Sequence, residues 1–203
     1  MMIPFLILLL IITINLGSPK LLLLLFTIFG FFFTGFLDDY LSIKNRKNTG
    51  LKSKEKFILQ SIISIIFIFI AYENNLINPL IKISESWEIN TSIFIFPISF
   101  LVLVGISNSV NLTDGLDGLA AGCSGIVFYG LGTEILMKEQ KELFVFSLLC
   151  YSMSGICLGF LKYNSYPAKI FMGDTGSLSI GAILGSIASV SYTHLTLPTK
   201  RIV

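Results

Sequence analysis

Long apolar runs alternate with short polar segments along this chain of 203 residues. Within a run the apolar residues are continuous, without the alternation of a strand or the single stripe of a surface helix. The runs lie at 2–16, 20–37, 57–72, 91–107, 118–136, 143–161 and 175–190. Most approach the ~20 residues that a helix needs to cross a bilayer. The pattern predicts an all-α, polytopic transmembrane helix bundle with about seven spans.

Composition agrees with a membrane protein. Hydrophobic residues make up 54% of the chain and charged residues 13%, whereas a soluble domain is about 25% charged. The mean hydropathy is +0.84. A large soluble α-helical core is the alternative interpretation. The net charge of +2 is too small to indicate a nucleic-acid partner.

The chain shows no internal repeat and no low-complexity linker, so we expect a single transmembrane domain over residues 1–190. Residues 191–203 follow the last apolar run abruptly and are expected to be a non-native tail. This tail contains the only histidine, His194, to which we assign no role.

Counting crossings predicts that the polar segments 38–56, 108–117 and 162–174 share one side of the membrane. That side carries eight basic residues, and the other side carries four. The eight are Lys44, Arg46, Lys47, Lys52, Lys54, Lys56, Lys162 and Lys169. Because cytoplasmic loops carry the excess of Lys and Arg, we expect this side to be cytoplasmic. Segment 73–90, with Trp87, is expected to form a solvated hairpin on the opposite side.

All five aspartates lie in these three segments: Asp38, Asp39, Asp114, Asp117 and Asp174. Acidic side chains at the edge of a membrane are costly and often functional. Adjacent carboxylates repel, which raises a pKa or recruits a cation. A polar helix end meeting water remains an alternative for the Asp38-Asp39 pair. Together with nearby lysines and glycines, the pattern indicates a metal-dependent site for a phosphorylated substrate.

The second acidic segment, residues 108–119, is dense in Asn, Asp and Gly. Asp114 and Asp117 are three residues apart, so a helical turn would place both on one face. A turn with side-chain caps is the alternative. The spacing and the terminal Glu of a calcium-binding loop are missing.

The third segment places Asp174 between Gly173 and Gly176 at the start of the last apolar run. Free backbone N–H groups at a helix start suit phosphate, and Asp174 can hold Mg²⁺ together with substrate phosphates. Phe171 can stack on a base or serve as an interfacial aromatic. Lysines in the basic segment 50–56 can hold phosphate, or contact lipid headgroups and set the topology.

Three motifs carry a family resemblance: Gly35-Phe-Leu-Asp-Asp-Tyr40, Asn111-Leu-Thr-Asp-Gly-Leu-Asp-Gly118 and Phe171-Met-Gly-Asp-Thr-Gly-Ser177. In this order and at this spacing, the chain resembles the polyprenyl-phosphate N-acetylhexosamine-1-phosphate transferases. It is most similar to their phospho-N-acetylmuramoyl-pentapeptide transferase branch. The resemblance covers residues 1–190.

The resemblance implies a magnesium-dependent reaction in peptidoglycan synthesis. Phospho-N-acetylmuramoyl-pentapeptide passes from its UDP-linked donor to undecaprenyl phosphate, giving lipid I and UMP. The implied partners are UDP-N-acetylmuramoyl-pentapeptide, undecaprenyl phosphate and membrane lipid, and a homodimer is left open. The implied location is the bacterial inner membrane, with the active site on the cytoplasmic face.

The resemblance also implies residue roles. Asp174 would be the main Mg²⁺ ligand, and Asp38 and Asp39 would lie beside the lipid phosphate, one of them as base or nucleophile. Our hypothesis is direct attack, with Asp39 removing the proton. The remaining implied residues are Asn111, Asp114 and Asp117 in the nucleotide and metal pocket, Phe171 at the uracil, and Lys54 and Gly173 in substrate binding.

Departures from the family pattern lead to two expectations. The family usually carries further spans at both ends and a His-rich motif near its C-terminus, so we expect this chain to be truncated at both ends. We therefore expect it to be inactive or weakly active on its own.

Two alternative functions remain. One is an N-acetylglucosamine-1-phosphate transferase of the same superfamily, although the Asn-Leu-Thr lead-in to Asp114 favours the muramoyl branch. The other is a cation-coupled transporter, which would require acidic residues near mid-span.

Overall fold

The structure, a computed structural model, describes residues 2–46, 50–77, 79–84, 87–138 and 143–193. Lys47, His194 and the rest of the expected tail at 194–203 lie outside the described residues.

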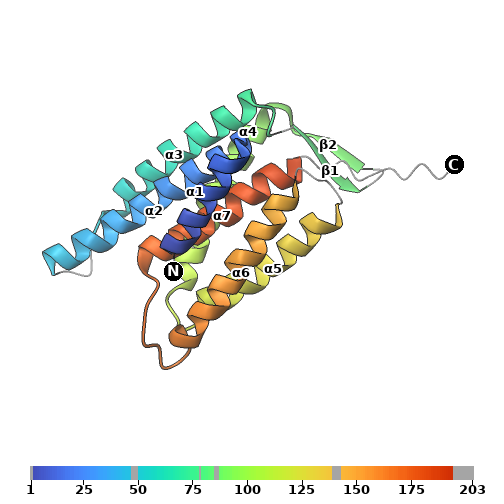
Figure 1. Ribbon diagram of the computed structural model, residues 1–203. Coiled ribbons are helices and arrows are strands. Elements are labelled where there is room, and N and C mark those ends of the chain that lie inside the picture. The colour runs from blue at the N-terminus through green and yellow to red at the C-terminus, as the bar shows by residue number, and fades with distance from the viewer. Residues whose placement is uncertain (1, 47–49, 78, 85–86, 139–142, 194–203) are drawn as a thin grey trace.

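Across this part of the chain the structure is a helix bundle with one small hairpin (Figure 1). The helices are α1 Met2–Leu16, α2 Pro19–Asn45, α3 Ser53–Glu73, α4 Ile95–Thr113, α5 Leu119–Met137, α6 Phe144–Asn164 and α7 Gly173–Thr193. The antiparallel strands β1 Leu80–Ser84 and β2 Trp87–Asn90 precede the short 3-10 helix η1 Ser92–Phe94. Leu80 pairs with Asn90 and Lys82 with Glu88. The helical fold class and the hairpin within 73–90 are confirmed.

Five of the described helical segments are long and apolar enough to cross a membrane: α2, α3, the η1–α4 segment Ser92–Thr113, α5 and α6. The expected count of about seven is therefore only approximate. Helix α1, with 15 residues, is shorter than the bilayer requires. Helix α7 has 21 residues, but it is rich in Gly and Ser. A helix surrounded by other helices can use small residues, because it does not face lipid.

Helix α7 is the centre of the bundle and packs along α2 and α4. Residues 176–190 of α7 are buried, apart from the half-buried Ala188. Glycines allow the close approach of these helices. A Cβ atom on Gly181 would lie 2.3 Å from the Cα of Ser107 in α4, and one on Gly35 in α2 would lie 2.2 Å from the backbone oxygen of Asp174. The start of α7 is thereby held against α2.

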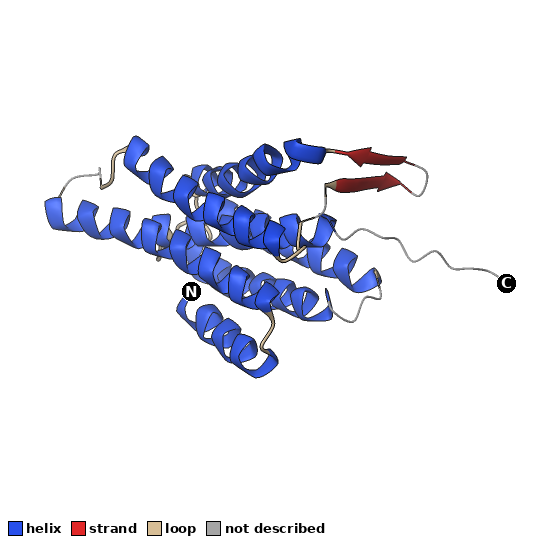
Figure 2. Cartoon of the chain, turned by 90° about the horizontal axis from the view of Figure 1, so that it is seen from above, coloured by secondary structure: helices blue, strands red, loops and turns tan. Residues whose placement is uncertain are grey.

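The three acidic segments meet at one end of the bundle. In Figures 1 and 2 the C-terminal end of α2 lies at the end opposite the β1–β2 hairpin, and Figure 1 shows the 165–172 loop away from the hairpin too. The arrangement follows from the alternating direction of successive helices, and it agrees with the predicted sidedness of these segments.

Helices α2 and α4 extend furthest beyond the apolar runs from which they were predicted. Helix α2 continues beyond residue 37 to Asn45, so Asp38 and Asp39 lie within a helix and not at its end. Helix α4 continues to Thr113 and includes Asn108 and Asn111. Polar side chains are tolerated in these last turns because they face one another across the bundle, as described next.

Candidate active site

Three carboxylates converge where α2 meets the first turn of α7. Asp38, Asp39 and Asp174 each offer a carboxylate oxygen, and these oxygens lie within 4.8 Å of one another. Asp38 is buried, and the other two are half-buried. Negative charges this close repel strongly in a partly buried site. Such a cluster is stabilised by a neighbouring cation or by protonation of one carboxylate.

Lys56 supplies a positive charge from the first turn of α3. Its Nζ lies 3.3 Å from Oδ1 of Asp38 and donates a hydrogen bond to Oδ2 of Asp174. Sequence reasoning singled out Lys54, which is exposed, and placed Lys56 only within the basic cluster. Among the described contacts, Lys56 is the lysine that reaches the carboxylates. Lys56 lies four residues before Gln60, a polar residue within an apolar run. This spacing is the sequence signal that places Lys56 on the inward face of α3.

Asp39 binds the start of α7. Its carboxylate accepts the backbone N–H groups of Asp174, at 3.2 Å, and of Thr175, at 2.9 Å, and also the Thr175 hydroxyl at 2.5 Å. The sequence suggested that N–H groups at this helix start were free for phosphate. In the structure these two are occupied by Asp39.

Asn111 of α4 orients Asp174 from the other side. Its Nδ2 donates to Oδ1 of Asp174 at 2.8 Å and to Oγ of Ser177 at 2.8 Å. Asp174 therefore has one oxygen bonded to Asn111 and the other to Lys56. Helices α3, α4 and α7 all contribute to the orientation of a single carboxylate.

Asp114 and Asp117 lie in the turn after α4 and have different partners. Burial, followed by the charge of Asp174, raises the pKa of Asp114 to about 6; the backbone N–H of Gly173 opposes this shift and the charge of Asp39 adds to it. Asp117 is exposed and accepts the backbone N–H of Ala168 at 2.9 Å. The expected stacking of both on one helical face is not seen, because residues 114–118 form a turn.

The same turn is tied to the loop before α7 by a buried asparagine. Asn164 accepts the backbone N–H of Gly118 at 3.1 Å and donates to the backbone oxygen of Ile170 at 2.9 Å. Asn164 is only 3% exposed. It was not among the predicted site residues, although it holds two acidic segments together.

Gly173 is the first residue of α7, and Phe171 lies two residues before it. Gly173 has φ +66°, and a Cβ atom there would lie 2.8 Å from Oδ2 of Asp39. Both the backbone conformation and the space therefore require glycine. The Phe171 side chain is 75% exposed, so its ring is accessible to a planar ligand.

A cleft of about 450 Å³ opens beside the carboxylates. Lys56 and Asn111, which both contact Asp174, are part of its lining. The full lining is Ser53, Lys54, Lys56, Phe57, Asn108 and Asn111. Two lysines and two amides next to three carboxylates suit a ligand that carries both phosphate and a bound cation.

The donor set fits Mg²⁺. Magnesium prefers carboxylate oxygens and usually takes one or two of them together with substrate phosphates. Asp38 and Asp174 are the best placed, because a cationic side chain already lies at both, whereas the oxygens of Asp39 are bonded to the backbone of α7. Lys56 provides the positive charge at these same two carboxylates.

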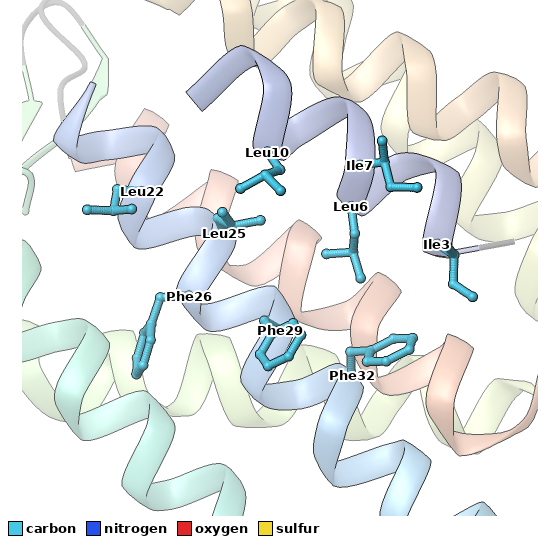
Figure 3. A pocket seen from close by; sticks show the side chains of 9 residues that line it. All are labelled: Ile3, Leu6, Ile7, Leu10, Leu22, Leu25, Phe26, Phe29 and Phe32. Atoms are coloured by element: carbon cyan, nitrogen blue, oxygen red, sulfur yellow. The ribbon is translucent and has the colours of Figure 1, made fainter. Parts of the chain in front are cut away.

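An apolar groove between α1 and α2 differs from this cleft in the side chains that line it. Its volume is about 630 Å³, and Figure 3 shows only hydrocarbon side chains along it. They are Ile3, Leu6, Ile7, Leu10, Leu22, Leu25, Phe26, Phe29 and Phe32. The groove can accommodate hydrocarbon, but it offers no group that binds phosphate.

The apolar helices and the polar site at one end of the bundle define a multi-pass membrane protein with a carboxylate and lysine centre. The sequence pattern of glycosyl transferase family 4 matches residues 21–192, and the chain belongs to this family. The chain is therefore a membrane-embedded member of a family of transferases.

Similar proteins carry the name phospho-N-acetylmuramoyl-pentapeptide-transferase. The one from Prochlorococcus marinus strain MIT 9301 is 82% identical over 197 residues, covering 97% of this chain and 55% of the relative. The protein from Prochlorococcus marinus subsp. pastoris is 63% identical over 96% of this chain and 54% of its own length. The Listeria monocytogenes protein is 45% identical over 77% of this chain and 47% of its own length. The resemblance drawn from the three motifs is confirmed, and the chain spans about half the length of these curated relatives.

Proposed function

We propose that this chain carries the catalytic centre for transfer of phospho-N-acetylmuramoyl-pentapeptide from UDP to undecaprenyl phosphate, giving lipid I and UMP. The observation that carries the proposal is the convergence of Asp38, Asp39 and Asp174, with Lys56 in contact with Asp38 and Asp174. The names of the relatives support the substrate assignment.

The proposed location is the bacterial inner membrane, with the site at the cytoplasmic face. The basic residues near this end of the bundle support that orientation. A site at the interface allows a soluble nucleotide donor to reach an acceptor whose tail stays in the bilayer. Membrane lipid and these two substrates are the proposed partners.

Phosphoryl transfer depends more on positioning and charge neutralisation than on covalent chemistry. Lys56 would neutralise the donor diphosphate, and Asn111 would keep the Asp174 carboxylate in a fixed orientation. Lys54 and Phe171 are proposed to bind the nucleotide, since both are exposed beside this centre. Asp114 and Asp117 are proposed to shape the nucleotide pocket through their contacts with the loop before α7.

The geometry suggests a different division of labour between the paired aspartates than the sequence did. Both oxygens of Asp39 are used to bind α7, so we propose that Asp39 mainly positions the helix. Asp38 accepts one backbone bond, from Leu51 at 2.8 Å, and lies next to Lys56. We therefore propose that Asp38, rather than Asp39, lies at the lipid phosphate during direct attack.

Magnesium is the proposed cofactor. When bound by Asp174 and Asp38, it would neutralise the charge that develops on the diphosphate as UMP leaves. The protein's own contribution is to keep these carboxylates oriented through Asn111, Lys56 and the backbone of Leu51.

The two alternatives are less well supported. An N-acetylglucosamine-1-phosphate transferase would use the same carboxylate centre, but the named relatives act on the muramoyl substrate by name. A cation-coupled transporter would place its acids near mid-span, whereas these acids lie where α2 and α4 approach their ends.

The test is release of UMP from UDP-N-acetylmuramoyl-pentapeptide in nanodiscs with undecaprenyl phosphate. Because the chain alone is expected to be inactive or weakly active, the assay includes a chimera. In it, residues 21–192 replace the matching segment of the 82%-identical relative. We expect magnesium-dependent UMP release that falls at least about 100-fold in Asp174→Asn and is unchanged in Glu73→Gln, at the far end of α3.

Three results would contradict the proposal. Equal or faster UMP release from UDP-N-acetylglucosamine would favour the other branch. UMP release that does not depend on the acceptor lipid would exclude the transfer step. Trapping of a phosphorylated enzyme with the UDP substrate alone would exclude direct attack.

A further inference from the structure

A reciprocal pair of amides joins α3 to α4 directly below the candidate active site. The Nδ2 of Asn108 donates to Oε1 of Gln60 at 2.7 Å, and the Nε2 of Gln60 donates to Oδ1 of Asn108 at 3.4 Å. Gln60 is 0% exposed. Asn108 also donates to the backbone oxygen of Val104 at 2.8 Å, which fixes its own side chain on α4.

Each amide lies one helical turn from a side chain that contacts Asp174. Gln60 follows Lys56 by four residues on α3, and Asn108 precedes Asn111 by three residues on α4. Residues at these spacings lie on the same helical face. Lys56 and Asn111 bind different oxygens of Asp174. The contacts therefore form a closed ring that runs from Asp174 through α3, across the amide pair, and back through α4.

We propose that Gln60 and Asn108 are positioning residues, which set the separation and rotation of α3 against α4 so that Lys56 meets Asp174. The inference rests on the proposed function only for its activity readout. Two hydrogen bonds between planar amides constrain rotation as well as distance. Lys56 has a long, flexible side chain, and its placement depends on where the α3 backbone lies.

Packing alone does not account for the pair. Apolar side chains of similar size would join α3 to α4 without the cost of burying polar groups. One of the two amides, Asn108, also lines the cleft together with Lys56 and Asn111. The amide pair thus lies next to the side chains that contact Asp174.

The variants are Gln60→Met, which keeps the volume and removes the amide, Asn108→Leu, and the exchange Gln60→Asn with Asn108→Gln. Gln60→Met is also combined with Lys56→Met to form a double-mutant cycle. The matched control is Ser61→Ala, since Ser61 lies on the same helix and bonds only to Phe57 of its own turn among the described contacts. Two quantities are measured: kcat for UMP release by the chimera, and the shift in unfolding temperature that Mg²⁺ alone causes in the chain.

We expect Gln60→Met and Asn108→Leu each to lower kcat by about tenfold and to enlarge the Mg²⁺-induced shift, since a displaced Lys56 competes less with the cation. The exchange variant should recover kcat to within about threefold of the unaltered chimera. In the Lys56→Met background, Gln60→Met should have no further effect on either quantity. Ser61→Ala should change neither.

Three results would overturn the inference. Additive effects of Gln60→Met and Lys56→Met on kcat would show that Gln60 has a structural role only. The same conclusion would follow if Gln60→Met lowered the unfolding temperature but left the Mg²⁺-induced shift unchanged. If the unaltered chimera released no UMP, the proposed function would fail, while the Mg²⁺ shift in the chain would still decide the positioning role. An unaltered chain whose unfolding temperature does not respond to Mg²⁺ would refute the positioning role as well.

Discussion

Asp39 of α2 accepts the backbone N–H of Thr175 in the first turn of α7 at 2.9 Å. Its neighbour Asp38 contacts Lys56 and the backbone of Leu51 instead. Successive residues of a helix point about 100° apart, so adjacent aspartates meet different elements. One carboxylate of the pair binds the start of α7, and the other faces Lys56 and the segment before α3.

Asp39→Ala should destabilise the chain, since it removes the acceptor for two N–H groups at the start of α7. The expected loss is about 1 kcal/mol, the usual cost of removing a helix cap. Thermal unfolding in detergent without magnesium measures it. Asp117→Ala is the matched control, because Asp117 is exposed and accepts a single backbone bond. Equal unfolding temperatures for the two variants would show that Asp39 does not support α7.

Gly35→Ala should separate α2 from α7. The added Cβ atom would lie 2.2 Å from the backbone oxygen of Asp174, so the backbones must move apart at a cost of about 1–3 kcal/mol. UMP release by the chimera should fall together with the unfolding temperature. Gly105→Ala on α4 is the control, since a Cβ atom there meets nothing within 4 Å; it should be neutral or stabilising. Similar behaviour of the two variants would argue against close packing at Gly35.

Removal of Lys56 should change magnesium binding and activity in opposite directions. The Lys56 ammonium lies at two carboxylates that are proposed to bind Mg²⁺, so Lys56→Met removes a competitor. The Mg²⁺-induced rise in unfolding temperature should therefore be larger than in the unaltered chain. UMP release should nevertheless fall, because a positive charge at the diphosphate is lost. Lys54→Met, two residues away and exposed, should leave the Mg²⁺ shift unchanged, and an equal shift in both variants would refute the competition.

Asp114 should make stability depend on pH. Its pKa is raised from 3.8 to about 6 in the folded chain, so between these values the folded state binds more protons than the unfolded state. Its contribution to stability is present below about pH 4 and is lost as the pH rises through 6. The unfolding temperature of Asp114→Asn minus that of the unaltered chain should therefore be larger at pH 7 than at pH 4. Both proteins are measured in EDTA. A difference that does not change with pH would contradict the raised pKa.

Much of the fold could be read from the chain alone. The seven apolar runs correspond to the seven helices of the described residues, and the aspartates lie at the predicted end of the bundle. The hairpin was anticipated within 73–90. Hydrophobic runs determine these features because a segment of this length and apolar composition is stable in a bilayer as a spanning helix.

The sequence could not distinguish among neighbours within the polar segments. Lys54 and Lys56 are both lysines at the start of one helix, yet only the position of α7 selects Lys56 as the partner of Asp174. Asp114 and Asp117 suggested a shared helical face, whereas contacts with Gly173 and Ala168 direct them to different partners.

The amino-acid sequence by itself determined the helical membrane fold, the gathering of the acids at one end of the bundle, and the family. The tertiary structure alone decided which carboxylate binds helix α7, which lysine neutralises the cluster, and which amides link α3 to α4. Apolar periodicity is a local property that each segment carries on its own. Contacts among side chains far apart in the chain exist only once packing has fixed the rotation of every helix.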